Sequence, residues 1–292
     1  MNHEIEYKDL VVNRPWVYLA KCLVWGVMIA LGVCLAGTQF WWLQALGVIV
    51  VAIAIAHGIE LEHQALHGIG TGRRWLDTKL GFVLGLPLLI SVHHYQDRHL
   101  HHHQHVGTAD DSEFFQFSKE DNNRPLRFAA NMLMVPHLAM VARLIWASWT
   151  GGSIGRVYNK NKERRIRREY AAFGVIVIVA IALMAIFRPL DAVVFLAFPI
   201  AACIHTLVEL PEHWDCDKTP SVFENTRTVR AGWLATWFTN GNNYHVEHHL
   251  APALRPEALR AFHLRIASRI AHQNDSYLNL IKNIFNRKAR YV

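Results

Sequence analysis

Cysteine is scarce in this sequence of 292 residues, which has only four, and no two of them are spaced as C-x-x-C. Cys22, Cys34 and Cys203 lie in apolar segments, and Cys216 lies in a polar loop. This distribution argues against both a disulfide framework and a thiolate zinc site.

Recognisable cofactor-binding motifs are also lacking. The glycine-rich run GIGTG at 68–72 does not have the spacing of a dinucleotide-binding loop and follows an expected helix, so it indicates a helix stop. No haem-binding domain is apparent. The N-terminal stretch MNHEIEYKDL carries three acidic residues and does not resemble a cleaved secretory signal. Without repeats or Pro/Gly-rich linkers, residues 1–292 are expected to form a single domain.

Apolar residues, by contrast, are abundant at 52%, while charged residues make up 18%. Four stretches approach the length of about 20 residues that crosses a bilayer, at 17–37, 41–62, 170–187 and 190–208. Short connections join the first pair and the second pair, so two helical hairpins are expected. The fold class predicted is an all-α integral membrane protein with a helical cytoplasmic cap formed by residues 63–169 and 209–292.

Two further segments are partly apolar. Residues 80–92 are interrupted by Gly85 and Pro87 and are too short to span, so they are expected to lie in the interface or to re-enter the membrane. Residues 132–149 form a mixed segment with the same expectation.

The positive charges orient this arrangement. The net charge is +7, and of the 30 Lys and Arg residues only Arg188 falls on the side opposite to all the others. The positive-inside rule therefore places both termini and the cap on the cytoplasmic side of the inner or plasma membrane. The basic run at 160–168 is expected to anchor the third span, and no nucleic-acid partner is expected.

Histidine is the most unusual component, with 19 copies concentrated in short stretches. The segment HQALH places His63 and His67 four residues apart, on one face of a helix that continues the second span. The segments HLHHH and HVEHH share the spacing H-x-x-H-H, in which positions i, i+3 and i+4 of a helix converge on one face. The second set is His99, His102 and His103, and the third is His245, His248 and His249.

A further histidine follows the fourth span. His205, Glu209 and His213 recur every four residues and would share a face of a continuous helix, although Pro211 favours a kink there. Ionisable residues at the end of a membrane helix are functional candidates by default.

Nine imidazoles exceed the four ligands that one zinc ion takes, so two metal ions are predicted. Nearby carboxylates can offset their charge or hold the outward-facing ring nitrogens. The residues expected in that role are Glu60, Asp111, Glu113, Glu209, Glu212 and Glu247.

The order H-x-x-x-H, H-x-x-H-H, H-x-x-H-H, divided by a membrane hairpin, resembles the membrane fatty-acid desaturase and hydroxylase family, as does NTRTVRAGWLATWFTNGNNYHVEHHLAP. The resemblance covers roughly residues 60–256. It implies two iron ions held by the eight histidines of the three motifs together with His213. Some members place an Asn one turn before that last ligand, where this chain has Glu209.

The resemblance further implies an O2-dependent oxidoreductase that removes hydrogen from an unactivated C–H bond of a lipid-soluble substrate. The expected partners are a fatty acyl chain or similar substrate, membrane lipids, and an external electron donor such as a ferredoxin, a rubredoxin or a cytochrome with its reductase. Desaturation is the leading expectation, and hydroxylation or ketolation of an acyl chain, an alkane or a carotenoid is the alternative. A metal transporter or a membrane zinc hydrolase is the rival from another class.

Overall fold

The computed structural model describes residues 6–113, 124–186, 191 and 193–289. The first helices in the chain are α1 (Pro15–Ala36), α2 (Trp41–Leu66), α3 (Arg74–Gly85), α4 (Val92–His105), α6 (Pro125–Met132) and α7 (Val135–Thr150). They are followed by α8 (Glu163–Met184), α10 (Phe198–His213), α11 (Val222–Asn225), α12 (Trp233–Phe238), α13 (His245–Leu250), α14 (Pro256–Ile266) and α15 (Tyr277–Ala289).

Short helical turns and one small sheet complete the described elements. The turns are η1 (Lys8–Leu10), η2 (Leu86–Leu88), η3 (Lys160–Lys162) and η5 (Ala267–Arg269), and the π-helical segment η4 (Val193–Ala197) leads into α10. Strands β1 (Arg227–Val229) and β2 (His272–Asn274) pair in parallel, with Thr228 opposite Gln273. The chain is therefore mostly helical, as predicted, with this small sheet added.

Three helices of the described chain are long and apolar enough to cross a membrane: Pro15–Ala36, Trp41–Leu66 and Phe195–His213. Two bent pairs raise the number to five if each forms one span. One joins α3 and η2 to α4 at 98°, and the other joins α6 to α7 at 59°. The protein thus has the helices of a membrane protein, and the break predicted within 80–92 lies at the first bend.

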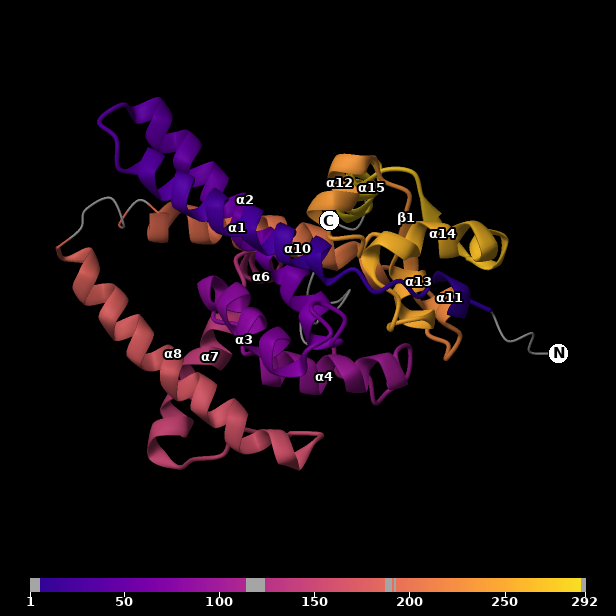
Figure 1. Ribbon diagram of the computed structural model, residues 1–292, viewed down its shortest axis with the longest axis horizontal. Coiled ribbons are helices and arrows are strands. Elements are labelled where there is room, and N and C mark those ends of the chain that lie inside the picture. Colours follow the sequence, from indigo (N-terminus) through magenta and orange to yellow (C-terminus); the bar gives the residue numbers. More distant parts are fainter. Residues whose placement is uncertain (1–5, 114–123, 187–190, 192, 290–292) are drawn as a thin grey trace.

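Three of the four expected spans correspond to these three apolar helices, and the fourth does not. Those at 17–37 and 41–62 correspond to α1 and α2, and the one at 190–208 corresponds to the later helix Phe195–His213. The expected span at 170–187 overlaps α8, which begins at Glu163 with a strongly charged first turn and is not among the three apolar helices. Position 187, the last of that expected span, lies outside the described residues. In Figure 1, α8 extends to the side opposite the C-terminal elements, with α7 beside it.

Helices α1 and α2 pack closely because glycines lie where they cross. A Cβ atom added at Gly47 would lie 2.5 Å from the backbone N of Ala36 and 2.5 Å from the carbonyl oxygen of Gly32. Small residues at a helix crossing let the two backbones approach, which is a principal source of helix association inside a membrane. The two helices are therefore closely packed around Gly32 and Gly47.

Helix α2 is longer than the hydrocarbon core of a bilayer is thick. Its 26 residues span roughly 39 Å at 1.5 Å per residue, compared with about 30 Å for the hydrocarbon core of a bilayer. Every residue from Ala54 to Leu66 is buried, including several polar ones. The end of α2 is therefore enclosed by protein, and it carries His63 within its last turn.

The C-terminal elements gather at one end of the molecule in Figure 1 and cover that end of α2. Asn240 donates through Nδ2 to the carbonyl oxygen of Glu60 (3.1 Å) and to Oε1 of Gln64 (2.9 Å). Strand β1 holds the turn that precedes α13, because Thr228 bridges to Tyr244 and Asn243 Nδ2 donates to the carbonyl oxygen of Val229 (2.8 Å). These bonds hold α13 against the membrane helices.

We expect Gly47→Ala to lower the stability of the folded protein by about 1–3 kcal/mol, because the added methyl group would overlap the backbone of α1. Thermal unfolding in detergent measures this. Gly26→Ala is the matched control, since a Cβ atom there would meet nothing within 4 Å. Equal melting temperatures for the two variants would contradict the close helix crossing.

Candidate metal centre

Nine buried or half-buried histidines, those singled out in the sequence, form two adjacent groups in which all ligating nitrogens lie within 4.8 Å of one another. They come from α2, α4, α10 and α13, four helices that are far apart in the sequence. The first group is His63, His67, His99, His103 and His248, and the second is His102, His213, His245 and His249.

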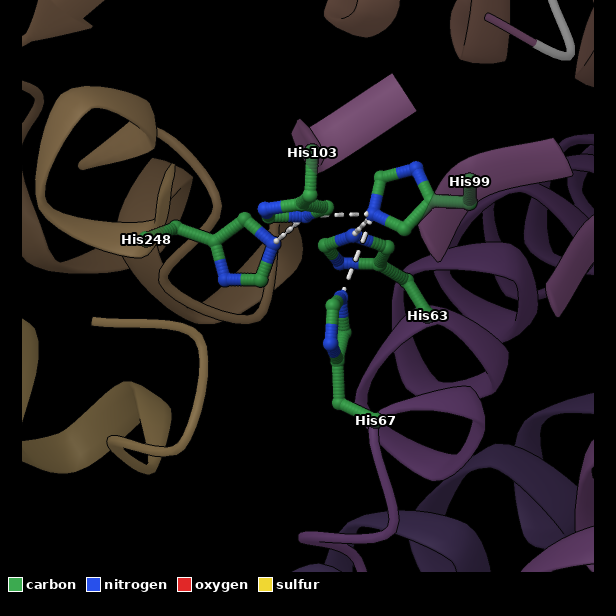
Figure 2. A group of neighbouring side chains, drawn as sticks. All are labelled: His63, His67, His99, His103 and His248. Carbon is green, nitrogen blue, oxygen red and sulfur yellow. Dashed lines mark hydrogen bonds between the residues drawn. The ribbon is translucent and has the colours of Figure 1, made fainter. Parts of the chain in front are cut away.

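In the first group the five rings point toward one centre (Figure 2). The Nε2 atom of His99 lies at similar distances from three other Nε2 atoms: 2.8 Å from that of His63, 3.1 Å from that of His67 and 2.9 Å from that of His103. One ring nitrogen carries either one proton or one lone pair, so it cannot satisfy three such neighbours by hydrogen bonds.

A shared metal ion accounts for this convergence. Two nitrogens bound at right angles, each about 2.1 Å from an ion, would lie roughly 3.0 Å apart. The Nε2 atoms of His248 and His103 are separated by 3.1 Å, which matches that value as well. The donor set and its spacing therefore fit a metal ion with more than four ligands.

The second group has the same character. The Nε2 atom of His245 lies 3.2 Å from those of both His213 and His249. Two carboxylates contact this second group: Glu113 Oε2 is 2.9 Å from His102 Nε2, and Glu212 Oε2 is 3.1 Å from His245 Nε2. A metal ion here would thus have four imidazoles and two carboxylates within reach.

Each H-x-x-H-H motif is divided between the two groups, which differs from the convergence expected for it. On α4, His99 and His103 face the first group and His102 faces the second, and on α13 His248 is separated from His245 and His249 in the same way. Residues i+3 and i+4 both lie near residue i on a helix, but they are displaced from it in opposite directions around the helix axis. Residues i and i+4 can therefore face one group while i+3 faces the other. The shared helices bring the groups together, and the rings of His103 and His249 stack at 4.2 Å.

Hydrogen bonds at the outward-facing nitrogens fix the tautomers of the second group. His213 Nδ1 donates to the carbonyl oxygen of Asn225 (3.1 Å), and His245 Nδ1 donates to Oδ1 of Asn242 (3.0 Å). His102 Nδ1 is 2.7 Å from Asp111 Oδ1. With the proton held at Nδ1, the Nε2 lone pairs of His213 and His245 face the centre, as metal ligands require.

The electrostatics of the site differ between ligands: burial lowers the pKa of His102, but Glu113 and Asp111 outweigh it and raise that pKa to about 10, whereas His248 and His249 are held neutral. Burial holds the pKa of His248 well below its usual value, and neighbouring rings, with those of His63 and His67 foremost, lower it further. Burial and the ring of His103 lower the pKa of His249 in the same manner. Metals bind the unprotonated imidazole, so this environment keeps His248 and His249 ready at neutral pH.

The carboxylate of Glu113 behaves differently. Burial alone would raise its pKa, but the rings of His102 and His99 hold it well below the usual value, so it is ionised. It brings a negative charge to a site that two cations would otherwise make strongly positive.

Three of the carboxylates expected beside the ligands have other neighbours. Glu60 and Glu209 form a third buried group with His205, again with ligating atoms within 4.8 Å of one another. Glu247 accepts from Thr228 Oγ1 (2.7 Å) and pairs with His263 Nδ1 (2.6 Å), so it fixes α13 against β1 and α14. Helix α10 continues through Pro211 to His213.

The remaining histidines near the motifs have structural contacts. His93 pairs with Glu169, and the Nδ1 atom of His94 is 2.8 Å from the hydroxyl oxygen of Tyr170. His101 stacks on Tyr158 with ring centroids 3.7 Å apart, away from both groups. Sequence reasoning missed the role of Asn242, which bridges Glu212 and His245; its only signal was its position in GNNYH, three residues before a motif histidine.

The chain is similar to known proteins over most of its length. The family model described as "Fatty acid desaturase" matches residues 39–280. Among curated proteins, the sn-1 oleoyl-lipid 12-desaturase of Anabaena variabilis is 25% identical over 121 residues, which is 38% of this chain and 34% of that protein. The matched stretch therefore spans about a third of that relative's length.

We expect His99→Ala to release metal, because His99 is the ring that contacts three others in the first group. The metal content of the purified protein, measured by inductively coupled plasma mass spectrometry, should fall by at least one ion per chain. His101→Ala, on the same helix but facing Tyr158, is the control and should keep its metal. Equal metal contents in the two variants would contradict the assignment of His99, and not His101, to the first histidine group.

Asn242→Ala removes the amide that orients both His245 and Glu212, so we expect the second group to bind metal about 10–100-fold more weakly. Competition with a chelator measures the change. Asn279→Ala on exposed α15 serves as the control, and the first group should be unaffected in both variants. An unchanged chelator profile in Asn242→Ala would argue against the orienting role.

Proposed function

The chain belongs to the fatty acid desaturase family, and from that premise we propose that it is a membrane-bound, O2-dependent oxidoreductase with a pair of iron ions. It acts on an unactivated C–H bond of a lipid-soluble substrate, with desaturation of a fatty acyl chain as the leading reaction. The single observation that carries the proposal is the convergence of nine imidazoles into two adjacent groups that share helices α4 and α13.

The donor set supports iron rather than zinc. The first group offers five imidazoles, more than the four ligands that zinc usually takes. Imidazole also suits iron, and carboxylates such as Glu113 and Glu212 are ligands that iron accepts beside it. When bound, a pair of iron ions would supply the redox chemistry that activates O2 and abstracts hydrogen from carbon.

The protein's own contribution is positioning and exclusion of water. Three rings of the second group donate hydrogen bonds to Asn242, Asn225 and Asp111, and these bonds restrict the rotation of the rings. Glu113 keeps a fixed negative charge beside them. Burial of the rings under α13 keeps bulk water from a strongly oxidising site.

The electron balance of desaturation requires a donor. Reduction of O2 to two molecules of water takes four electrons, of which the substrate provides two when its C–C bond becomes a double bond. The other two must come from outside the reacting pair, and we propose a small electron-transfer protein such as a ferredoxin, a rubredoxin or a cytochrome. The basic cytoplasmic surface suits an acidic donor.

We propose that the chain forms one domain with four crossings. Helices α1, α2 and the α10 span supply three of them and α8 supplies the fourth, with the basic run at 160–168 anchored at the cytoplasmic surface. Residues 63–169 and 209–292 then form the cytoplasmic cap, and both termini share that side. This orientation places the metal ligands just beneath the inner leaflet.

The test is expression in a host of known lipid composition, together with a reductase system, followed by mass spectrometry of the fatty acids and other lipids. We expect new double bonds with the wild type and none with His99→Ala. New alcohols or ketones would instead support the alternative reaction of the same centre. Zinc in place of about two irons per chain, with no new product, would refute the proposal and favour the hydrolase or the transporter.

A further inference from the structure

The two histidine groups differ in the carboxylates beside them. The first group consists of five imidazoles and the second of four. Glu113 and Glu212 each contact one ligating nitrogen at the edge of the second group, at 2.9 Å and 3.1 Å. In the first group, Glu113 Oε1 faces only the outward-facing Nδ1 atom of His99, at 3.9 Å. Carboxylate oxygens are therefore at hand for an ion in the second group.

The contact between Glu113 and His102 has the geometry of two neighbouring ligands. His102 Nε2 is buried and has no hydrogen-bond partner within the described residues, although Glu113 Oε2 is only 2.9 Å away. The oxygen therefore lies off the direction in which that nitrogen would donate a hydrogen bond. Two atoms that bind one ion at right angles, each about 2.1 Å from it, are roughly 3.0 Å apart.

Asn242 orients the second carboxylate. Its Nδ2 atom donates to Glu212 Oε1 (2.6 Å), which leaves Glu212 Oε2 facing His245 Nε2. Glu212 is buried and directly precedes His213 on α10. The end of that helix thus supplies a carboxylate and an imidazole to the same group.

Arg98 holds the backbone that carries Glu113. Its Nε atom donates to the carbonyl oxygen of Ser112 (3.0 Å) and its Nη2 atom to that of Glu113 (3.0 Å). In return, Ser112 Oγ donates to the carbonyl oxygen of Arg98 (2.9 Å). Arg98 directly precedes His99, so the segment is fixed to the helix that carries ligands of both groups. Rotation within the Glu113 side chain is then enough to bring its carboxylate onto an ion in the second group.

A small cavity lies beside the first group and not beside the second. Its volume is about 20 Å3, and His63, His67 and His248 line it, whereas none of the second group's histidines does. His99 and His103 do not line it either, so it lies to one side of the first group. One water molecule needs about 10–15 Å3, so this space suits a molecule of about one or two heavy atoms and excludes an acyl chain.

We propose that Glu113 and Glu212 bind the second ion directly, so that the two ions are unequal and only the first keeps a position for a diatomic molecule. Four imidazoles and two carboxylates fill the six positions of octahedral coordination, whereas five imidazoles leave one position open. The cavity beside His63, His67 and His248 is the space for the molecule that takes it. The inference rests on the proposed function for the identity of the ions as iron.

Nitric oxide is a suitable probe, because it is diatomic, binds ferrous iron and gives a characteristic electron paramagnetic resonance signal. The full-length protein is loaded with iron, reduced without oxygen and titrated with nitric oxide, and iron is counted in the same samples. We expect about one nitric oxide per pair of irons in the wild type. Glu113→Ala should bind about two, because it opens a position on the second ion.

Asp110→Ala is the matched control, because Asp110 is an exposed acidic residue of the same segment, and it should keep the wild-type ratio. Two nitric oxides per pair of irons in the wild type would overturn the inference. An unchanged ratio in Glu113→Ala with both irons retained would overturn the role of Glu113.

Mössbauer spectra of the wild type test the same inference without a variant, which matters if Glu113→Ala loses iron. Unequal ligand sets should give two distinct signals of equal area. A single signal from both irons would overturn the inference.

Lipid products of the same preparations separate this inference from the proposed function. New double bonds from a protein in which both irons bind nitric oxide would overturn only the inequality of the ions. A ratio of about one that rises to about two in Glu113→Ala, without any lipid product, would uphold the unequal ions and overturn the proposed reaction.

Discussion

The convergence of imidazole nitrogens is the constraint on which the rest of this structure depends. Lone pairs that face one another across about 3 Å repel, and a buried polar group left without a partner costs about 1–3 kcal/mol. A bound metal ion would remove this cost, because every lone pair would then coordinate the ion. In the second group, hydrogen bonds to Asn242, Asn225 and Asp111 keep three of the rings from turning away to other partners.

The need to bring these imidazoles together determines the length and burial of the membrane helices as much as the lipid does. Helix α2 is longer than the hydrocarbon core needs, and its last turns are wholly enclosed although they carry histidine, glutamate and glutamine. Such a polar helix end is stable only if protein covers it. The segment from β1 to α13 provides the cover, with Asn240 bonded to the backbone and side chains of α2, and Glu247 tied to β1 and α14.

Much of this arrangement could be predicted from residue spacing. The apolar runs of α1 and α2 and the histidine motifs are local patterns, and the structure brings together all nine histidines selected from them. The division of each H-x-x-H-H motif could not be predicted, because it depends on how α4 and α13 cross, which no local pattern records. Glu113 and Glu212 were expected beside the ligands, and the structure places both carboxylates at the second group. The crossing expected at 170–187 stays a prediction, since the apolar run of α8 is continuous with a charged turn that belongs to the same helix.

The histidines of α13 have a consequence for the order in which the protein is made. Both groups draw on residues 245–249, although the other ligands occur between residues 63 and 213. The ribosome therefore completes every apolar helix of the described chain before it has produced the last ligands of either group. A nascent chain truncated before residue 245 would therefore leave both groups incomplete.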